Sequence, residues 1–342
     1  MGLQATVIRN ILFAATTYGE AYDNLRVQAG FTDKEISDSS ETVEWQKAAK
    51  LFDLLADLTN NEQIGLALGF ETGLSMLGML GFMMQASKNL EEALTVYCRF
   101  GYMVCPMITF HYYKEGNKAI IELNQNPVWK NTYPRNARIG VDHTIASIVH
   151  HTRLLTGKSI FPEAVELEFG KIAVDAYKQA LHCQVLFNAP IHKLVYDASV
   201  MSTPVITSDV SLFEMFQEIL AQKKAIMMQT NCTEAVKNLL LMQFKGQIPT
   251  VEEAAAAMDM TPRTLQRKLT EENTSYRNIA GEVKKELAIH LMKNPGTSIT
   301  EVAEVLGYGD LPAFRRAFKT WTKATPKEVK RQLHSEQMTV MG

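Results

Sequence analysis

The feature of this sequence that most constrains its fold is one pattern that occurs twice within the last hundred residues. The first copy spans residues 251–269 and the second spans residues 299–318. Equivalent positions are 48 residues apart in the first half of the pattern and 49 apart in the second half. The second copy therefore carries one additional residue between its halves. A repeat in register indicates a duplicated supersecondary unit.

Each copy predicts a helix-turn-helix. A short amphipathic helix carries a small residue, Ala255 or Ala303, where a second helix must approach closely. A turn of three to five residues follows, and then a helix with apolar residues four apart and basic residues between them. Both first helices open with a capping box, in which a hydroxyl and a carboxylate pair with free backbone N–H groups, Thr250 with Glu253 and Ser298 with Glu301.

The second helix of each copy is predicted at Pro262–Glu271 and at Pro312–Trp321, with proline at the first helical position. The apolar positions expected to face the core are Leu265, Leu269, Phe314, Phe318 and Trp321. Mostly basic and amide side chains remain outward, and Arg and Gln suit guanine and adenine edges in a major groove. A helix at Tyr276–Met292 would place the two helices about 34 Å apart, in successive major-groove segments of double-stranded DNA. The alternative is a basic face that meets only solvent, and the duplication argues against it.

The charge distribution points to the same region. Residues 245–335 hold 15 Lys and Arg against 11 Asp and Glu, whereas residues 1–244 hold 20 against 25. A basic segment on an acidic body suggests that only this segment meets a polyanion. At 342 residues the chain is expected to form two domains. These are a first domain at 1–228, a linker at 229–233, a DNA-binding domain at 234–335 and a tail at 336–342.

The first 228 residues predict an α+β fold with a small, mostly antiparallel sheet, and the rest predicts an all-α double helix-turn-helix domain. Helical periodicity covers 1–60, 90–100, 137–155, 174–181 and 211–228. A period of two predicts strands at 107–113, 118–123, 163–169, 185–187 and 193–196. Lys114–Asn117 is typical of a hairpin turn. Residues 124–136, which contain Pro127 and Pro134, are expected to form a loop.

Several other classes of protein are not expected. No stretch has the length of a membrane span or the pattern of a secretory signal. The four cysteines are scattered, which is typical of reduced thiols in a cytoplasmic protein, and no metal or cofactor is expected. His143, His150 and His151 lie on one predicted helix without a ligand set, so we interpret them as buried or surface histidines. No catalytic serine elbow or phosphate-binding glycine loop occurs, and an enzyme is not expected.

These motifs resemble those of a known family. Residues 306–319, 321–322 and 324–326 are similar to the signature of the AraC/XylS family of transcription regulators, and Met260–Leu269 resembles its first recognition helix. This resemblance covers about residues 234–333. Parts of the body resemble the arabinose-binding-type sensor domain of one subgroup, at 25–31, 73–78, 90–94 and 194–198. The resemblance implies a homodimeric regulator that responds to a small-molecule effector, and does not establish arabinose as that effector.

Two groups of DNA contacts are expected. The resemblance implies that seven residues at matching positions contact bases, Arg263, Gln266, Arg267, Leu311, Pro312, Arg315 and Arg316. Contacts to the DNA backbone are expected from four residues, Thr261, Lys268, Lys319 and Thr325. The sequence assigns no effector-binding residue. Six methionines fit either an adaptable pocket or core filler, Met76, Met79, Met83, Met84, Met103 and Met107.

The sequence departs from the family pattern at four positions. Leu311 and Pro312 offer no side-chain hydrogen bond where many relatives carry polar residues, which leaves apolar contact to a thymine methyl group. Lys323 replaces a frequent Gly and Val329 a frequent Tyr. A left-handed Lys323 would cost about 1 kcal/mol. The second recognition helix is therefore expected to hold the protein on DNA more than to recognise bases.

The predicted function is sequence-specific DNA binding by a transcription regulator, an activator controlled by a small-molecule effector bound to the first domain. RNA polymerase is a candidate partner, and no membrane is involved. The alternative is an effector-independent DNA-binding protein whose first domain only dimerises or recruits a partner.

Overall fold

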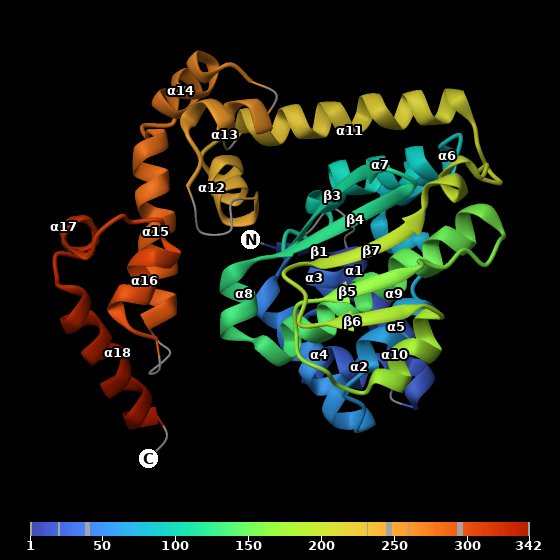
Figure 1. Cartoon of the computed structure of the whole chain (residues 1–342), viewed down its shortest axis with the longest axis horizontal. Helices are drawn as coiled ribbons and strands as arrows, with labels where there is room; N and C mark the ends of the chain where they lie inside the picture. Colours follow the sequence, from blue (N-terminus) through green and yellow to red (C-terminus); the bar gives the residue numbers. More distant parts are fainter. Residues whose placement is uncertain are drawn as a thin grey trace. The chain divides into compact units, whose positions relative to one another are not determined.

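The computed structural model of the chain describes residues 2–19, 21–37, 42–230, 232–243, 248–258, 260–292 and 297–340 (Figure 1). The chain divides into an N-terminal unit (residues 1–125 and 133–222) and a C-terminal unit (residues 126–132 and 223–342). Helix α11 (Val210–Thr230) ends, and helix α12 (Cys232–Gln243) begins, inside the predicted linker 229–233. The described residues of that segment are therefore helical. In the described part of the chain, no helix combines the length and hydropathy that crossing a membrane requires.

The N-terminal unit combines helices with two small sheets. Besides α11, its helices are α1 (Ala5–Ala15), α2 (Tyr22–Gln28), α3 (Asp33–Ser37), α4 (Trp45–Thr59), α5 (Ile64–Glu71), α6 (Met79–Ala86), α7 (Leu90–Phe100), α9 (Pro134–Thr156) and α10 (Val174–Leu181). Its strands are β1 (Gly2–Gln4), β2 (Thr42–Glu44), β3 (Ile108–Glu115), β4 (Lys118–Gln125), β5 (Ala164–Leu167), β6 (Gln184–Phe187) and β7 (His192–Asp197). Short 3-10 turns lie at Thr16–Tyr18, Leu74–Leu77, Gly101–Met103 and Ala198–Ser202.

The larger sheet has the strand order β3-β4-β7-β5-β6. Its neighbouring strands are antiparallel except for β5 and β6, which are parallel. Glu115 pairs with Lys118 across the predicted hairpin, which leaves Gly116 and Asn117 as a two-residue turn. Gly116 has φ 58°, a conformation that a residue without a Cβ atom adopts readily. The α+β fold predicted from the sequence is confirmed.

Helix α9 is the central helix of the N-terminal unit, and α5 packs closely against it. Gly65 and Gly69 lie one turn apart on α5. A Cβ atom on Gly65 would lie 2.2 Å from the Ile139 carbonyl oxygen, and one on Gly69 would lie 2.5 Å from that of His143. The two glycines therefore allow the two helix backbones to meet. Four of the six methionines noted in the sequence are buried and fill the core, Met76, Met83, Met84 and Met107.

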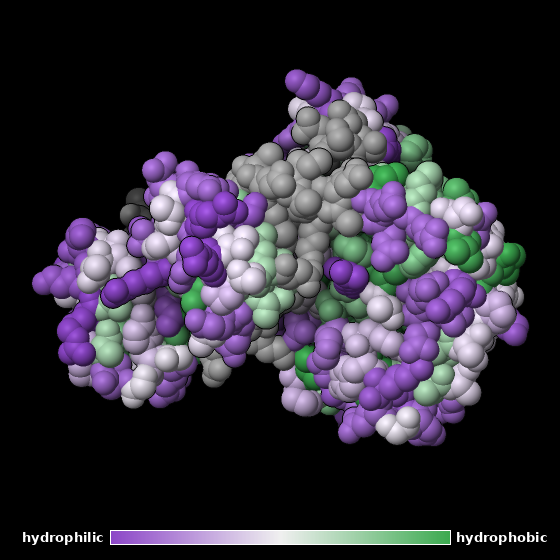
Figure 2. All heavy atoms as spheres, turned by 90° about the horizontal axis from the view of Figure 1, so that it is seen from above, coloured by the Kyte–Doolittle hydropathy of each residue, from purple (hydrophilic) through white to green (hydrophobic). Residues whose placement is uncertain are grey.

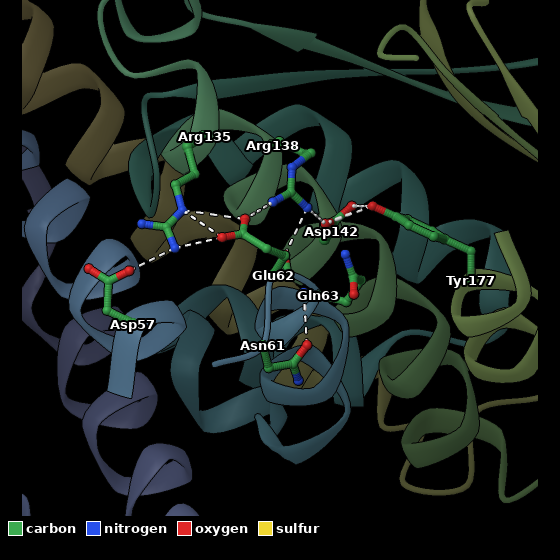
Figure 3. A network of polar contacts seen from close by, with 8 residues as sticks. All are labelled: Asp57, Asn61, Glu62, Gln63, Arg135, Arg138, Asp142 and Tyr177. Carbon is green, nitrogen blue, oxygen red and sulfur yellow. Dashed lines mark hydrogen bonds and ion pairs between the residues drawn. The ribbon is translucent and has the colours of Figure 1, made fainter. Parts of the chain in front are cut away.

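A polar network connects α9 to α4 and to the segment that precedes α5 (Figure 3). Arg135 donates to Glu62 at 2.6 Å and to Asp57 at 2.8 Å. Arg138 also donates to Glu62 at 2.6 Å, and its other nitrogen lies 3.3 Å from the Asp142 carboxylate. The two arginines share one carboxylate and so fix the first turns of α9 against the neighbouring helices.

Two predictions for the first 228 residues are wrong. Residues 124–136, predicted as a loop, contain α8 (Pro127–Thr132) and the first turn of α9. Each helix begins at a proline. The backbone N–H at the first position of a helix has no acceptor within the helix, so proline, which lacks this N–H, loses no hydrogen bond there. Residues 1–60, predicted as helical, also contain β1 and β2. These strands pair over three residues each, which is too short for a period of two to be visible.

The C-terminal unit is all-α, as predicted. Helices α13 (Val251–Ala257) and α14 (Pro262–Glu271) form the first helix-turn-helix, and α16 (Ile299–Val305) and α17 (Leu311–Thr322) form the second. Helix α15 (Tyr276–Met292) lies between them, and α18 (Pro326–Val340) follows (Figure 1). At 17 residues, α15 is about 25 Å long. Helices α12, α16 and α17 all pack on α15, which makes it the central support of this unit.

Candidate DNA-binding surface

Both motifs begin with the capping box that the sequence predicts. The Thr250 N–H donates to the Glu253 carboxylate at 2.8 Å, and the Glu253 N–H donates to the Thr250 hydroxyl at 3.2 Å. Ser298 and Glu301 repeat this arrangement at α16. The backbone hydrogen bond from Ser298 lowers the pKa of Glu301, so the carboxylate stays ionised at neutral pH. The start of each first helix is thus fixed by local chemistry.

Apolar side chains at matching positions hold each recognition helix against its unit. Leu265 and Leu269 of α14 are fully buried, as are Phe314 and Phe318 of α17. Trp321, which was also predicted to face inward, is half-buried and lies edge-on to Phe318 at 6.3 Å. Because one face of each helix is packed in the core, the opposite face is available to a partner.

The seven residues predicted to contact bases all lie on the two recognition helices. Six are exposed, and Leu311 is half-buried. Arg267 lies 3.9 Å from Glu271 in an exposed pair, a contact worth about 0–1 kcal/mol, so this ion pair holds the guanidinium only weakly. Four of the others make no side-chain hydrogen bond or ion pair within the described residues, Arg263, Gln266, Arg315 and Arg316. These side chains are therefore accessible to a partner.

The second recognition helix begins one residue earlier than predicted. Helix α17 starts at Leu311, and Asp310 caps it by accepting the Ala313 N–H at 2.5 Å. Pro312 is therefore the second helical residue, where an N–H would still lack a partner within the helix. After the capping residue, the first turn of α17 begins with Leu311 and Pro312. No side chain of this turn can form a hydrogen bond with a base.

The four residues predicted to contact the DNA backbone have different environments. Thr261 caps α14 by accepting an N–H from its first turn at 3.2 Å. Thr325 forms another capping box with Glu328 at the start of α18. Lys319 is exposed, whereas Lys268 is half-buried. Lys319 is thus the more accessible of the two lysines, and the two threonines mark helix N-termini, whose N–H groups suit phosphate.

Helix α15 anchors the second motif through two contacts that the sequence analysis missed. The Lys284 ammonium lies 4.5 Å from the centre of the Tyr308 ring, and burial lowers the pKa of this lysine. A Cβ atom on Gly281 would lie 3.2 Å from Nε1 of Trp321, so the indole packs directly on the helix backbone. Lys284 and Gly281 carry no local signal, because their partners lie 24 and 40 residues further along the chain.

Glu272 connects the first motif to α12. Its carboxylate accepts the backbone N–H of Cys232 at 2.6 Å and that of Thr233 at 2.7 Å. The helix N-terminus is therefore capped by a residue about 40 positions later in the chain. Sequence rules for helix caps look three residues ahead and do not find such a partner.

The surface of the C-terminal unit differs in character from that of the N-terminal unit. On the face shown in Figure 2, hydrophilic residues cover most of the described C-terminal unit, at the left, and apolar patches are more frequent on the N-terminal unit, at the right. This contrast agrees with the basic character of residues 245–335. A phosphate backbone would meet the excess of Lys and Arg over Asp and Glu in these residues.

The three histidines of α9 differ in burial. His143 and His151 are buried, and desolvation lowers their pKa to about 4 and about 3, so both are neutral at neutral pH. His150 is half-buried. Across the residues that the structure describes, no group of three or more His, Cys, Asp or Glu could hold a metal ion. These histidines are core and surface residues of one helix, as the sequence indicates.

Comparison with known proteins supplies a second line of observation. The model of the arabinose-binding domain of the AraC transcription regulator matches residues 19–205, and a helix-turn-helix domain model matches residues 254–332. An uncharacterised HTH-type transcriptional regulator of Mycobacterium tuberculosis is 27% identical over 294 residues, which cover 82% of this chain and 81% of that protein. The ornithine utilization regulator of Pseudomonas aeruginosa is 23% identical over 275 residues, 79% of each protein. The crystal structure of the transcriptional regulator CdpR from Pseudomonas aeruginosa matches 90% of this chain and 96% of its own, with 20% identity and a TM-score of 0.47.

Proposed function

Because the chain belongs to the AraC family of transcription regulators, with an arabinose-binding-type N-terminal domain and a helix-turn-helix C-terminal domain, we propose that it is an effector-controlled activator that binds a specific operator as a homodimer. In this proposal residues 1–228 sense the effector and dimerise, residues 229–233 link the domains and residues 234–335 bind DNA. The protein acts in the cytoplasm, where the DNA is, and contacts RNA polymerase.

The observation that carries the DNA-binding part is the matched pair of recognition helices. Each buries two large apolar residues and exposes Arg side chains on the opposite face. Arg267 and Gln266 on α14 supply the donor and acceptor groups that base edges in a major groove require. Lys319 on α17 supplies a point charge for a phosphate. We therefore assign base reading mainly to α14 and anchoring mainly to α17.

The experiment starts from sites selected by the full-length chain out of random double-stranded DNA. Binding of Arg267→Ala and Lys319→Ala is then compared on a selected site and on a scrambled site over a range of salt. Arg267→Ala is expected to lose about 1–3 kcal/mol of discrimination at particular base pairs. Lys319→Ala is expected to weaken both complexes evenly and to reduce the salt slope by about one.

The matched control is Arg331→Ala, which removes an exposed positive charge on α18, outside both recognition helices. It should leave the base preference unchanged. If Arg267→Ala weakens binding to selected and scrambled DNA equally, Arg267 does not read a base. Failure to select any site would contradict sequence-specific binding itself.

Homodimer formation and activation have their own tests. Sedimentation equilibrium of the full chain should give the mass of a dimer, and a persistent monomer at micromolar concentration would contradict that part. A promoter that carries the selected site should drive more transcription when the chain is present. Equal or lower transcription would contradict activation but leave DNA binding intact.

A further inference from the structure

A cavity in the N-terminal unit is lined by residues to which the sequence assigns no role. It has a volume of about 320 Å³ and lies between the last turns of α9, the end of α5, the segment that follows α9 and the end of α10. It falls within residues 19–205, the part matched by the arabinose-binding domain model. The volume is at the small end of the range of about 300–1,000 Å³ typical of ligand pockets.

The apolar part of the lining includes two aromatic rings, each next to an imidazole. Phe161 and His182 have ring centres 4.6 Å apart, and Phe70 and His150 have ring centres 6.2 Å apart. The remaining apolar lining residues are Val149, Ile160 and Ala180. Such walls favour a hydrocarbon body over a polyhydroxylated one, because a sugar needs polar partners on several sides.

The polar part of the lining comes from Arg153, Ser159 and Gln179, together with the two imidazoles. None of the lining residues is acidic. The side chains of Arg153, Ser159 and Gln179 make no hydrogen bond or ion pair with any residue that the structure describes. Burial and the charge of Arg153 lower the pKa of His150, although Glu71 raises it, so His150 is a neutral hydrogen-bonding group at neutral pH. The permanent charge of the cavity is therefore the Arg153 guanidinium.

Two of the helices that form the walls, α9 and α10, are joined by a buried hydrogen bond. The Tyr177 hydroxyl of α10 donates to the buried Asp142 carboxylate of α9 at 2.8 Å (Figure 3). Tyr177 is two residues before Gln179, and Asp142 is about two turns before His150. This bond keeps the lining of the two helices in place before a ligand arrives, which reduces the cost of ordering the site on binding.

We propose that this cavity is the effector site and that it binds a small monocarboxylic acid with an aromatic or branched apolar body. The assignment of an effector role rests on the proposed function. The planar guanidinium of Arg153 offers two parallel N–H donors, which match a carboxylate. The two aromatic–imidazole pairs contact the apolar body from two sides, and Ser159 and Gln179 supply further hydrogen bonds. A cationic ligand is not expected, because the lining offers no carboxylate to pair with it.

The same end of α9 provides a connection toward the DNA-binding domain. The Ile206 N–H donates to the Leu155 carbonyl at 2.9 Å, two residues after Arg153. The Ile206 side chain packs on Gly157, where a Cβ atom would lie 2.8 Å from it. Ile206 lies four residues before the start of α11, the helix that leads to the C-terminal unit. In this proposal, a ligand held by Arg153 would act on the turn of α9 that contacts the segment before α11.

The first experiment measures binding to the full chain by calorimetry in the absence of DNA. The probes are phenylacetate and 4-methylpentanoate, their neutral amides, and inorganic phosphate as an anion without an apolar body. At least one acid should bind saturably, and its amide and phosphate should bind about tenfold more weakly or worse. Saturable binding of neither acid, or equal binding of acid and amide, would overturn the proposal.

Variants locate the binding. Arg153→Gln removes the charge from an exposed side chain and should weaken acid binding about tenfold or more. Phe161→Ala removes an exposed aromatic ring from the lining of the cavity and should also weaken acid binding. Lys178→Gln is the matched control, because it removes a positive charge on α10 that does not line the cavity. Unchanged acid binding by both Arg153→Gln and Phe161→Ala would place the ligand elsewhere and overturn the assignment.

A second arm tests the effector role. The affinity of the full chain for its selected DNA site should change at least about fivefold on saturation with the acid, and not in Arg153→Gln. Binding of the acid with unchanged DNA affinity would overturn the effector role of the cavity. The two failures are separable: a chain that selects no DNA site contradicts the proposed function, and calorimetry without DNA still decides whether the cavity binds the acid.

Discussion

The Tyr177 hydroxyl lies 2.8 Å from one carboxylate oxygen of Asp142 and 2.9 Å from the other. Asp142 is fully buried, and burial raises its pKa to about 7 although Tyr177 and Arg138 lower it. An unfolded aspartate has a pKa of about 3.9. Between about pH 4 and pH 7 the folded chain therefore holds a proton that the unfolded chain has lost. The contribution of Asp142 to the free energy of unfolding falls as pH rises through this window.

Asp142→Asn should remove this pH dependence, because the amide is neutral at every pH. The wild-type chain should lose stability relative to the variant by up to about 1.4 kcal/mol per pH unit between pH 4 and pH 7. Urea unfolding of both proteins at a series of pH values measures the difference. His143 and His151 titrate in both proteins, so the comparison isolates Asp142.

Asp57→Asn provides the control for Asp142→Asn. Asp57 belongs to the same network, but its side chain is 66% exposed and its bond to Arg135 is a surface ion pair. Its loss should cost less than about 1 kcal/mol and should not produce the trend across pH 4–7. A stability difference between wild type and Asp142→Asn that stays constant over this range would show that Asp142 is ionised in the folded chain.

Gly69→Ala should destabilise the N-terminal unit by about 1–3 kcal/mol. Alanine normally gains up to about 1 kcal/mol over glycine inside a helix. Here the added Cβ atom would lie 2.5 Å from the His143 carbonyl oxygen and 2.6 Å from the Ala146 Cβ atom, so α5 and α9 must separate. The steric cost involves two helix backbones and exceeds the gain in helix propensity. The midpoint of urea unfolding measures the result.

The control for Gly69→Ala is Gly73→Ala. Its Cβ atom would meet only the Ser75 hydroxyl oxygen, at 3.8 Å, and its φ is −85°. We expect a change within about 0.5 kcal/mol of wild type. Equal effects of the two substitutions would mean that α5 and α9 are not in close backbone contact.

Lys323→Gly should stabilise the C-terminal unit by about 1 kcal/mol. Lys323 ends α17 with φ 61° and ψ 4°, the left-handed conformation that the sequence comparison with the family anticipates. Lys323→Ala is the control, since it removes the same side chain but keeps the Cβ atom, and should give no gain. Native-state hydrogen exchange of the α17 amides measures the change. Equal protection in the Gly and Ala variants would show that the conformation carries no strain.

Local signals made the C-terminal unit predictable. Capping boxes, proline near the start of a helix and apolar residues four apart each act within one turn, and together they predicted α13 to α17 with boundaries within one residue for α14, α15 and α17. The hairpin β3–β4 was predictable for the same reason. Strands β1 and β2 and helix α8 were not, because three-residue ladders and a six-residue helix are too short to display a period.

Contacts between distant residues were not predictable. The sequence shows that α14 and α17 expose basic side chains, but not that Glu272 caps α12 or that Trp321 packs on Gly281. The candidate effector cavity was also missed, since Phe70, Arg153 and His182 come from three separate segments. No spacing rule relates such residues, and only the packing of α5, α9 and α10 brings them together.

The last prediction concerns Leu311, which opens the second recognition helix and is half-buried. Its side chain cannot hydrogen-bond, so any base preference at this position must come from apolar contact, most simply with a thymine methyl group. In the selected site, replacing one thymine by deoxyuridine removes that methyl group alone. The replacement should weaken wild-type binding, and Leu311→Ala should abolish the effect. Gln266→Ala, on the first helix, should leave the effect intact. Each thymine replacement could instead weaken wild-type and Leu311→Ala binding equally. In that case Leu311 does not contact a thymine methyl group, and α17 holds the protein on DNA without recognising a base through this residue.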